Sequence, residues 1–583
     1  MDDSSASQAS TSSVDVPERE CEARELYPFH AAPSVAIKTS ANHEPPTSIF
    51  AIRDICYLIA EALPQPDFLS AASETDTIAS HAARHNLYSL AMVSKELFYA
   101  ATTFLWRTIN DSRALFRALG VGLELDSPMA LMSGAEIDAV LCPHVKQLLR
   151  PGNPLGRIAL DHFRYYARKV QNLRIIVQDL PSTTLQYVQS LLPPGIVNLF
   201  PTLRQLTWVD FNPHPPFAVD ISHFLHSTHL SCLTLVFDDQ DEPLDTRAAQ
   251  TSCGDAVCAF VATVKRMKPE LRELCIYTPA SVPVSSAILR GFRGIRKVDL
   301  QFPLARSASH ARGNTRQRMP ALTEVEQLDM LWTARGDAEA LLAEVSLANV
   351  VHLSVNTCAD PDYAFLEEAL VLSTKTSLQL QTVDIVSAGY EWRALDCRCD
   401  FAVFLNSFVV HQNLRSIAIC LPGYCFSFAQ SHLDFMIRTW RQLEVLDLTF
   451  KLPPTYDDLP TLDVTIPHIL SLCTRLKYLH LPGIVAGSDV REGFTIPCCP
   501  ASRLRHLSSN QLHLRGPHVL DVAFELCKAF PCLEEVGPSN GEDHDGVWAQ
   551  LDRLLHAVRY KDNYALLEQL LKIMHRTSSS SLP

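Results

Sequence analysis

Residues 443–448, LEVLDL, and residues 476–481, LKYLHL, carry the same pattern of apolar positions. An apolar residue is followed by two variable residues, a second apolar residue, one variable residue and a third apolar residue. Copies of this pattern recur along most of the chain. The clearest copies begin at Leu230, Leu271, Leu443 and Leu476, others at Leu203, Ile295, Val325, Val350, Leu380 and Leu414, and weaker ones at Val145, Leu173, Leu504 and Leu533.

Successive copies lie about 24 to 34 residues apart, which is at and above the long end of the leucine-rich-repeat period of about 20 to 29 residues. One longer interval separates Leu230 from Leu271. Between the copies lie helix-like stretches, such as 255–267, 337–345, 434–440 and 519–530. A doubly wound α/β domain would give a few such matches, but not about a dozen at near-constant spacing. We therefore predict an α/β fold in which stacked units form an irregular leucine-rich-repeat solenoid, with parallel strands on one side and helices on the other.

Composition narrows the class of partner. The chain has 583 residues, of which 47% are hydrophobic and 20% are charged, and its formal net charge is −14. We expect no nucleic-acid partner, because phosphate binding favours basic proteins. No stretch is apolar enough to predict a membrane span, and the polar, acidic start does not resemble a secretory signal. The 17 cysteines are scattered, so we expect reduced thiols and an intracellular location, cytoplasmic or nuclear.

The predicted organisation has five parts. Residues 1–46 are rich in Ser, Ala, Pro and acidic residues, so we expect disorder there. A small all-α domain at 47–112, with a polar insert at 67–86, precedes the repeat array at 113–545. Residues 546–576 show two apolar helical faces and are interpreted as a cap on the last repeat, with a partner-binding helix as the alternative. Residues 577–583 are expected to be loose.

Two helical patterns define the small α domain. Ile52, Ile55 and Leu63 recur at helical spacing before Pro64, where we expect the first helix to end. A polar stretch follows, and a second helical pattern begins at Leu87 and continues to Trp106.

These segments, IFAIRDICYLIAEALP at 49–64 and LYSLAMVSKELFYAATTFLWR at 87–107, together resemble an F-box. The resemblance rests on Leu63-Pro64, on Val93-Ser94-Lys95 and on Leu105-Trp106. The segment departs from the family pattern at 52–54, Ile-Arg-Asp, where Leu-Pro-Glu is usual, and at the polar insert. An F-box followed by leucine-rich repeats is a familiar arrangement, and the style of the chain resembles F-box-like families of mushroom-forming fungi.

The resemblance implies a function as well as a fold. An F-box docks on a Skp-type adaptor and so joins a cullin–RING ubiquitin ligase, while the distal domain holds a protein substrate. Each residue carried over as an adaptor contact can instead be a core residue of its own helix. The implied Skp-adaptor contacts are Ile52, Ile55, Leu63, Pro64, Leu87, Leu90, Val93, Ser94, Phe98, Leu105 and Trp106.

No catalytic motif was found: the chain lacks GxSxG, P-loop, GxGxxG and HExxH sequences. The tight cysteine groups at 397–399 and 498–499 have the wrong spacing for a zinc site, so we expect no metal and no cofactor. The sequence therefore predicts a non-enzymatic adaptor. A repeat scaffold with a vestigial F-box is the second hypothesis, and an enzyme of unrecognised type is a distant third. The pattern does not orient each unit well enough to assign substrate contacts.

Overall fold

The computed structural model describes residues 53–62, 74–110, 114–115, 119 and most of 134–559. The part of the last range that it leaves out comprises 181, 192–197, 212–220, 239–246, 280, 305–319, 333–336, 343, 358–377, 388–397, 454–458, 488–493, 500–501, 516–518 and 538–546. The predicted disorder of 1–46, the loose tail at 577–583 and the second helix of the predicted cap lie outside the described residues.

The described strands form one 15-stranded parallel sheet in which almost every strand pairs with the next one along the chain. β10 pairs β11 at the side of this path, and β14 and β16 form a small second sheet. The strands are β1 (Thr108–Ile109), β2 (Asn172–Ile176), β3 (Gln205–Asp210), β4 (Cys232–Phe237), β5 (Glu273–Tyr277), β6 (Lys297–Gln301), β7 (Gln327–Trp332), β8 (His352–Thr357), β9 (Thr382–Ser387), β10 (Arg398–Asp400), β11 (Ser416–Ser427), β12 (Val445–Lys451), β13 (Tyr478–Leu481), β14 (Ile484–Ala486), β15 (His506–Ser509), β16 (Leu512–Leu514) and β17 (Glu535–Gly537).

The middle apolar residue of the repeated pattern explains this sheet. In each strand that residue aligns with its counterpart in the neighbouring strand, and every one is buried. One-residue shifts would turn these side chains to the other face, so the apolar pattern fixes the register. From β2 to β17 the aligned residues are Leu173, Leu206, Leu233, Leu274, Val298, Leu328, Leu353, Val383, Ile417, Leu446, Leu479, Leu507 and Val536.

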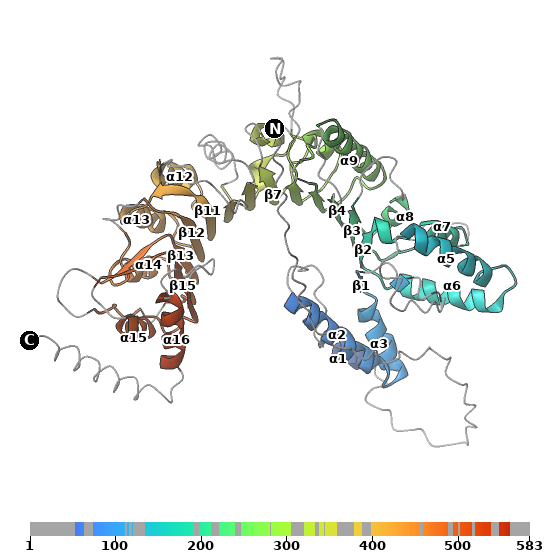
Figure 1. Ribbon diagram of the computed structural model, residues 1–583, viewed down its shortest axis with the longest axis horizontal. Helices are drawn as coiled ribbons and strands as arrows, with labels where there is room; N and C mark the ends of the chain where they lie inside the picture. Colours follow the sequence, from blue (N-terminus) through green and yellow to red (C-terminus); the bar gives the residue numbers. More distant parts are fainter. Residues whose placement is uncertain are drawn as a thin grey trace, which may run out of the picture.

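Helices cover the outer side of the sheet, and the whole array bends into an arch with the strands on its inner side (Figure 1). This confirms an α/β solenoid with strands on one side and helices on the other. The helices of the array are α5 (Gly134–Leu148), α6 (Pro154–Ala167), α7 (Ser182–Ser190), α8 (Ser222–Leu225), α9 (Arg247–Met267), α10 (Asp337–Leu342), α12 (Phe401–Phe408), α13 (Gln430–Thr439), α14 (Thr465–Leu472), α15 (Val519–Ala529) and α16 (Val547–Arg559). No described helix is both long and apolar enough to cross a membrane.

Two predictions about the pattern were wrong in detail. The copy assigned to Val145 lies inside α5, because apolar residues three and four apart also line one face of a helix. The copy assigned to Leu173 begins three residues earlier, at Val170, since Leu173 is the middle residue of its strand.

Three helices precede the array: α1 (Arg53–Ala62), α2 (Glu74–Ala91) and α3 (Lys95–Leu105). We call them the helical module. The second helix begins at Glu74, within the polar insert predicted at 67–86, whereas the apolar pattern placed its start at Leu87. Its start gives a weak apolar signal, because Ala83 is the one buried side chain within 82–86. The predicted continuous helix is also broken at Met92 and Val93.

The two ends of the array are closed differently. At the start, the short strand β1 joins the helical module directly to β2. At the other end, Trp548, Leu551 and Leu555 of α16 are buried and belong to the same core as the repeats. A helix in this position protects the last repeat from water, as solenoid ends require.

Candidate binding surfaces

The helical module is fixed to the array by aromatic stacking. The ring of Trp106, at the end of α3, stacks on Tyr166 of α6 with a centroid distance of 4.4 Å. Tyr99 meets Tyr165 edge to face at 6.3 Å. These contacts join two helices that are about 60 residues apart in sequence, so Trp106 is already engaged within the chain.

Lys169 reinforces the same junction. Its ammonium donates to the hydroxyls of Thr102 and Thr103, both at 3.0 Å, and to the carbonyl of Tyr99 at 3.3 Å. It also lies 4.4 Å from the centroid of the Tyr165 ring. One cation from the first repeat therefore holds three residues of α3, and the module has a defined position on the array.

Several predicted adaptor contacts lie in the core of the helical module. Leu87 is fully buried, together with Cys56, Ala60, Leu97 and Ala100. A side chain without exposed surface holds the three helices together and cannot touch a partner in this arrangement. The predicted residues that pack partly buried against this core are Leu90 and Leu105.

Other predicted contacts lie at the break between α2 and α3. Val93 is 65% exposed, and its neighbour Met92 is 67% exposed. Ser94 begins α3 as its N-cap, where its hydroxyl accepts a hydrogen bond from the backbone N–H of Leu97 at 3.2 Å. Phe98 is half-buried and meets Tyr99 edge to face. The structure thus brings an exposed apolar pair next to a well-formed helix start.

The remaining predicted contacts are not described. Ile52, Leu63 and Pro64 lie outside the described residues, and Ile55 is described only as part of the backbone of α1. Sequence reasoning missed Met92, although an exposed Met beside Val93 follows from the break before the cap at Ser94. The signal was present in the Ser-Lys-Glu-Leu sequence, which is typical of a helix start.

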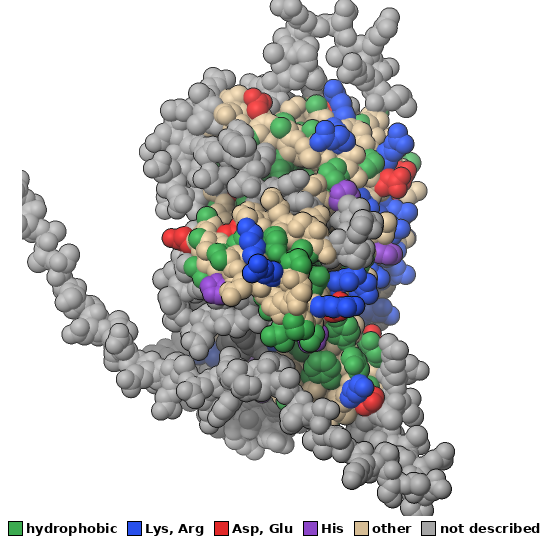
Figure 2. Space-filling view, turned by 90° about the vertical axis from the view of Figure 1, so that its right-hand side faces the viewer, with side chains coloured by type: hydrophobic (Ala, Val, Ile, Leu, Met, Phe, Trp, Pro, Cys, Tyr) green, Lys and Arg blue, Asp and Glu red, His purple; other side chains and the backbone are tan. Residues whose placement is uncertain are grey.

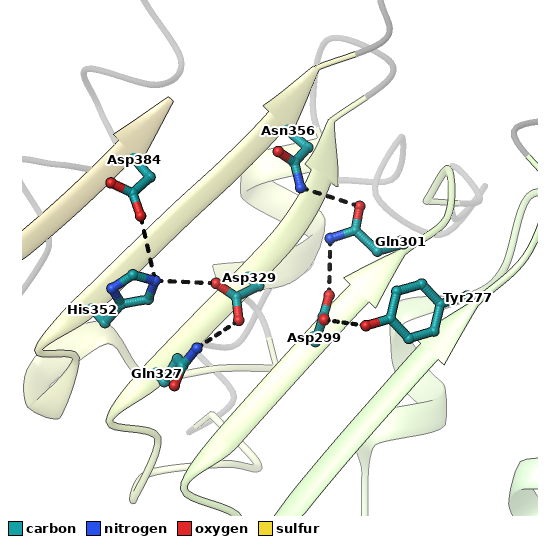
Figure 3. Close-up of polar contacts among 8 residues, drawn as sticks. All are labelled: Tyr277, Asp299, Gln301, Gln327, Asp329, His352, Asn356 and Asp384. Carbon is teal, nitrogen blue, oxygen red and sulfur yellow. Dashed lines mark hydrogen bonds and ion pairs between the residues drawn. The ribbon is translucent and has the colours of Figure 1, made fainter. Parts of the chain in front are cut away.

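A second candidate surface lies on the inner face of the sheet, where polar side chains of β5 to β9 form two neighbouring groups of hydrogen bonds and ion pairs (Figure 3). The hydroxyl of Tyr277 donates to Asp299 at 2.5 Å, and the amide of Gln301 donates to the other oxygen of Asp299 at 2.9 Å. Asn356 donates in turn to Gln301 at 3.4 Å. These residues come from alternate positions of three strands, so the strand pleat directs them to one face.

The second group lies on β7, β8 and β9. Gln327 donates to Asp329 at 2.9 Å. The Nε2 atom of His352 lies 3.4 Å from Asp329 and 3.7 Å from Asp384, so one imidazole bridges carboxylates of β7 and β9. Asp299, Asp329 and Asp384 occupy equivalent positions of their strands. We call these eight residues the inner polar network, and they are Tyr277, Asp299, Gln301, Gln327, Asp329, His352, Asn356 and Asp384.

Burial sets the electrostatics of this network. Desolvation raises the pKa of Asp299, although the hydrogen bonds from Tyr277 and Gln301 oppose that rise. Desolvation raises the pKa of Asp384 as well, while the charge of His352 opposes it. The pKa of Tyr277 is raised by burial and by its bond to Asp299. The phenol is therefore a hydrogen-bond donor at neutral pH rather than an anion.

Two histidines of the inner face behave in opposite ways. The hydrogen bond with Asp329 raises the pKa of His352, and the charges of Asp329 and Asp384 add to this effect. Burial instead lowers the pKa of His480 to about 4, against the effect of its hydrogen bond with Asn510. His352 therefore favours the protonated form, whereas His480 is neutral at neutral pH.

The inner polar network can exchange hydrogen bonds and charge with a partner lying on the sheet. It offers carboxylates, amides and one imidazole on a rigid backbone. Among the described residues, no group of three or more His, Cys, Asp or Glu side chains is arranged to hold a metal ion. Sequence reasoning missed the network because its members are spread from 277 to 384 and meet only when the strands align.

Comparison with known proteins gives no further constraint. No protein-family model matches the chain, and no curated protein is similar to it in sequence.

Proposed function

We propose that this protein is a substrate-recognition adaptor of a Skp–cullin–F-box ubiquitin ligase. The helical module would dock a Skp-type adaptor, and the repeat array would hold a protein substrate. The observation that carries the proposal is the exposed apolar surface of the module at Met92 and Val93, at the position where the F-box resemblance requires contact with the adaptor.

The distribution of exposed apolar side chains supports this role. Apolar surface on a small helical unit is covered by a partner helix in many complexes. Eleven large hydrophobic side chains are exposed within the described residues, and five of them belong to the helical module: Leu58, Tyr88, Met92, Val93 and Tyr99. The module thus carries almost half of this surface on a small part of the chain.

The junction with the array supports the second half of the role. Because Trp106 stacks on Tyr166 and Lys169 binds α3, the module and the first repeats move together. A ligase receptor needs such a fixed link, since the bound substrate must be held at a defined distance from the transferring subunit.

A binding comparison tests the proposal. The purified full chain is mixed with a Skp-type adaptor, and the wild type is compared with the double variant Met92→Asp, Val93→Asp. The wild type should form a complex, and the variant should not, because two buried charges at an interface cost several kcal/mol. A matched control is Leu155→Asp, Ile158→Asp on α6, which changes two equally exposed apolar residues outside the module.

A repeat scaffold without a ligase role is the second candidate function. One observation favours it: Trp106, which the resemblance gives to the adaptor, is half-buried against Tyr166 of the chain itself. One result of this binding comparison distinguishes the two functions. If the wild type forms no complex with any Skp-type adaptor while retaining its fold, the ligase role fails and the scaffold remains.

A further inference from the structure

A row of charged residues lies at one edge of the sheet, immediately before the strands begin. We call it the strand-start row. Its members before β1 to β6 are all basic, whereas those before β7 and the later strands are a mixture of basic and acidic residues. Its charged members are Arg107, Arg204, Arg272, Arg296, Glu326, Arg415, Glu444, Lys477, Arg505 and Glu534.

The second half of the row neutralises itself. Lys477 lies 2.7 Å from Glu444, and Arg505 lies 3.7 Å from Glu534. Both pairs join residues of neighbouring strands. These cations therefore have an internal partner and offer little charge to another molecule.

In the first half, Arg296 also has such a partner, because its guanidinium lies 3.3 Å from Glu326. The other arginines near the starts of β3 to β6 are different. Arg204 and Arg272 are exposed, and Arg293 is exposed beside them in the loop that leads to β6. No ion pair of the described residues involves any of these three guanidinium groups. Lys and Arg side chains gather along one side of this part of the molecule, with few acidic ones among them (Figure 2). This stretch stands out in a chain whose net charge is −14.

These cations surround a hollow of about 680 Å³ at the sheet edge. A single acidic residue, Glu270, takes part in its lining, and His229 lines it as well, but no Phe, Tyr or Trp does. The fourth cation that lines the hollow is Lys268, and it already has a partner within the chain, because its ammonium donates to the carbonyl of Ser227 at 2.9 Å. The three arginines are thus the groups free to meet an anion.

The backbone under the row is rigid. The carbonyl of Arg204 accepts hydrogen bonds from Ser231 and Cys232, and that of Arg272 accepts from Arg296 and Lys297. The backbone N–H of Arg293 donates to the carbonyl of Pro269. At the strand pitch of about 4.8 Å, Arg204 before β3 and Arg272 before β5 are held about 10 Å apart, and β3 to β6 span about 14 Å. Because the backbone of the row is already ordered, its conformational entropy falls little when a ligand binds.

We propose that the strand-start row between β3 and β6 binds an extended segment of a partner protein that carries alternating Asp or Glu residues. In an extended chain, alternate side chains lie about 6.7 Å apart on one side, so two or three carboxylates fit a row of about 14 Å. A line of guanidinium groups suits several single charges, each paired with one arginine. Duplex nucleic acid is disfavoured by the net charge, and single strands by the missing aromatic platforms.

This inference rests on the proposed adaptor role, for which it names the class of substrate. Its test uses the full chain without any adaptor, so the two can fail separately. Fluorescence anisotropy measures the binding of a labelled Glu-Thr repeat peptide, beside a Gln-Thr repeat, a phosphoserine-Thr repeat and a single-stranded RNA. The Glu-Thr peptide should bind best, and its affinity should fall as salt is added.

Two variants make the test specific. Arg272→Glu, Arg293→Glu should weaken binding of the Glu-Thr peptide about tenfold or more, and Arg272→Gln, Arg293→Gln should weaken it less. The matched control Arg505→Glu changes an exposed strand-start cation of the second half and should leave the affinity unchanged. Equal binding of the Gln-Thr peptide, equal loss in the control, or binding of only the phosphoserine peptide or the RNA would each overturn the proposal.

Discussion

Replacing Lys169 by Met should loosen the helical module without disturbing the distant repeats. The ammonium of Lys169 contacts three residues of α3 and the ring of Tyr165. The Met side chain keeps most of the apolar stem but loses the charge and its donors. The variant thus isolates the polar part of the junction.

The size of the loss in stability depends on whether the substitution leaves a polar group of α3 without a hydrogen-bond partner. The hydroxyl of Thr102 also donates to the backbone carbonyl of Phe98 at 2.7 Å, and the hydroxyl of Thr103 donates to the backbone carbonyl of Tyr99 at 2.9 Å. The hydroxyl donors of Thr102 and Thr103 therefore keep a partner in the variant, and the loss includes their bonds with the cation and its contact with the Tyr165 ring. We expect about 1–2 kcal/mol, the usual net value for a few partly exposed contacts of a charged group.

Amide hydrogen exchange measured by mass spectrometry reports the local opening of α3 separately from that of the other elements. Amides of α3 should exchange about 5- to 30-fold faster in the variant, because that factor corresponds to 1–2 kcal/mol of opening free energy. Amides of β11 to β13 should be unchanged, since each repeat contacts only its neighbours. Lys146→Met is the control, because the ammonium of Lys146 lies over Tyr187, away from the module. Equal exchange of α3 in both variants, or a uniform change across the array, would refute the reasoning.

Two further predictions concern the sheet. Leu353→Ala should destabilise the array by about 2–5 kcal/mol in urea unfolding, because this fully buried residue belongs to the aligned apolar row, while Leu378→Ala, at a side chain 68% exposed, should have almost no effect. For His352, the raised pKa means that its protonated form is stabilised by folding, so its contribution is complete below the unfolded pKa of about 6.5 and is lost as pH rises through the folded value. The variant His352→Gln should therefore be less stable than the wild type at pH 5.5, with a difference that disappears at pH 8.5; a constant difference would show that the two carboxylates do not act on it.

The buried side of the repeat was predictable from sequence, because buried positions are apolar and recur at a regular spacing. The apolar residues at fixed spacing predicted twelve strands whose middle residues, such as Leu233 and Leu446, align in the sheet. The pattern misled at Val145, where the same three-residue spacing belongs to a helix. It also missed the start of α2, because a helix that buries alanines has no strong apolar face.

The exposed side was not predictable, because solvent-facing positions have no periodic signal. Asp299, Asp329 and Asp384 are separated by 30 and 55 residues in the chain, yet they fall at equivalent positions of their strands. The strand-start arginines are similar: Arg204 and Arg272 become neighbours in one row only when the strands stack. The neighbours on such a surface can be identified only when the register of the strands is known, and the structure provides that register.

The most direct test of the central claim is a calorimetric titration of the purified full chain with a Skp-type adaptor. The account predicts a one-to-one complex that is lost in Met92→Asp, Val93→Asp and retained in Leu155→Asp, Ile158→Asp. The absence of binding by a folded wild type, or equal binding by the Met92→Asp, Val93→Asp variant, would contradict it.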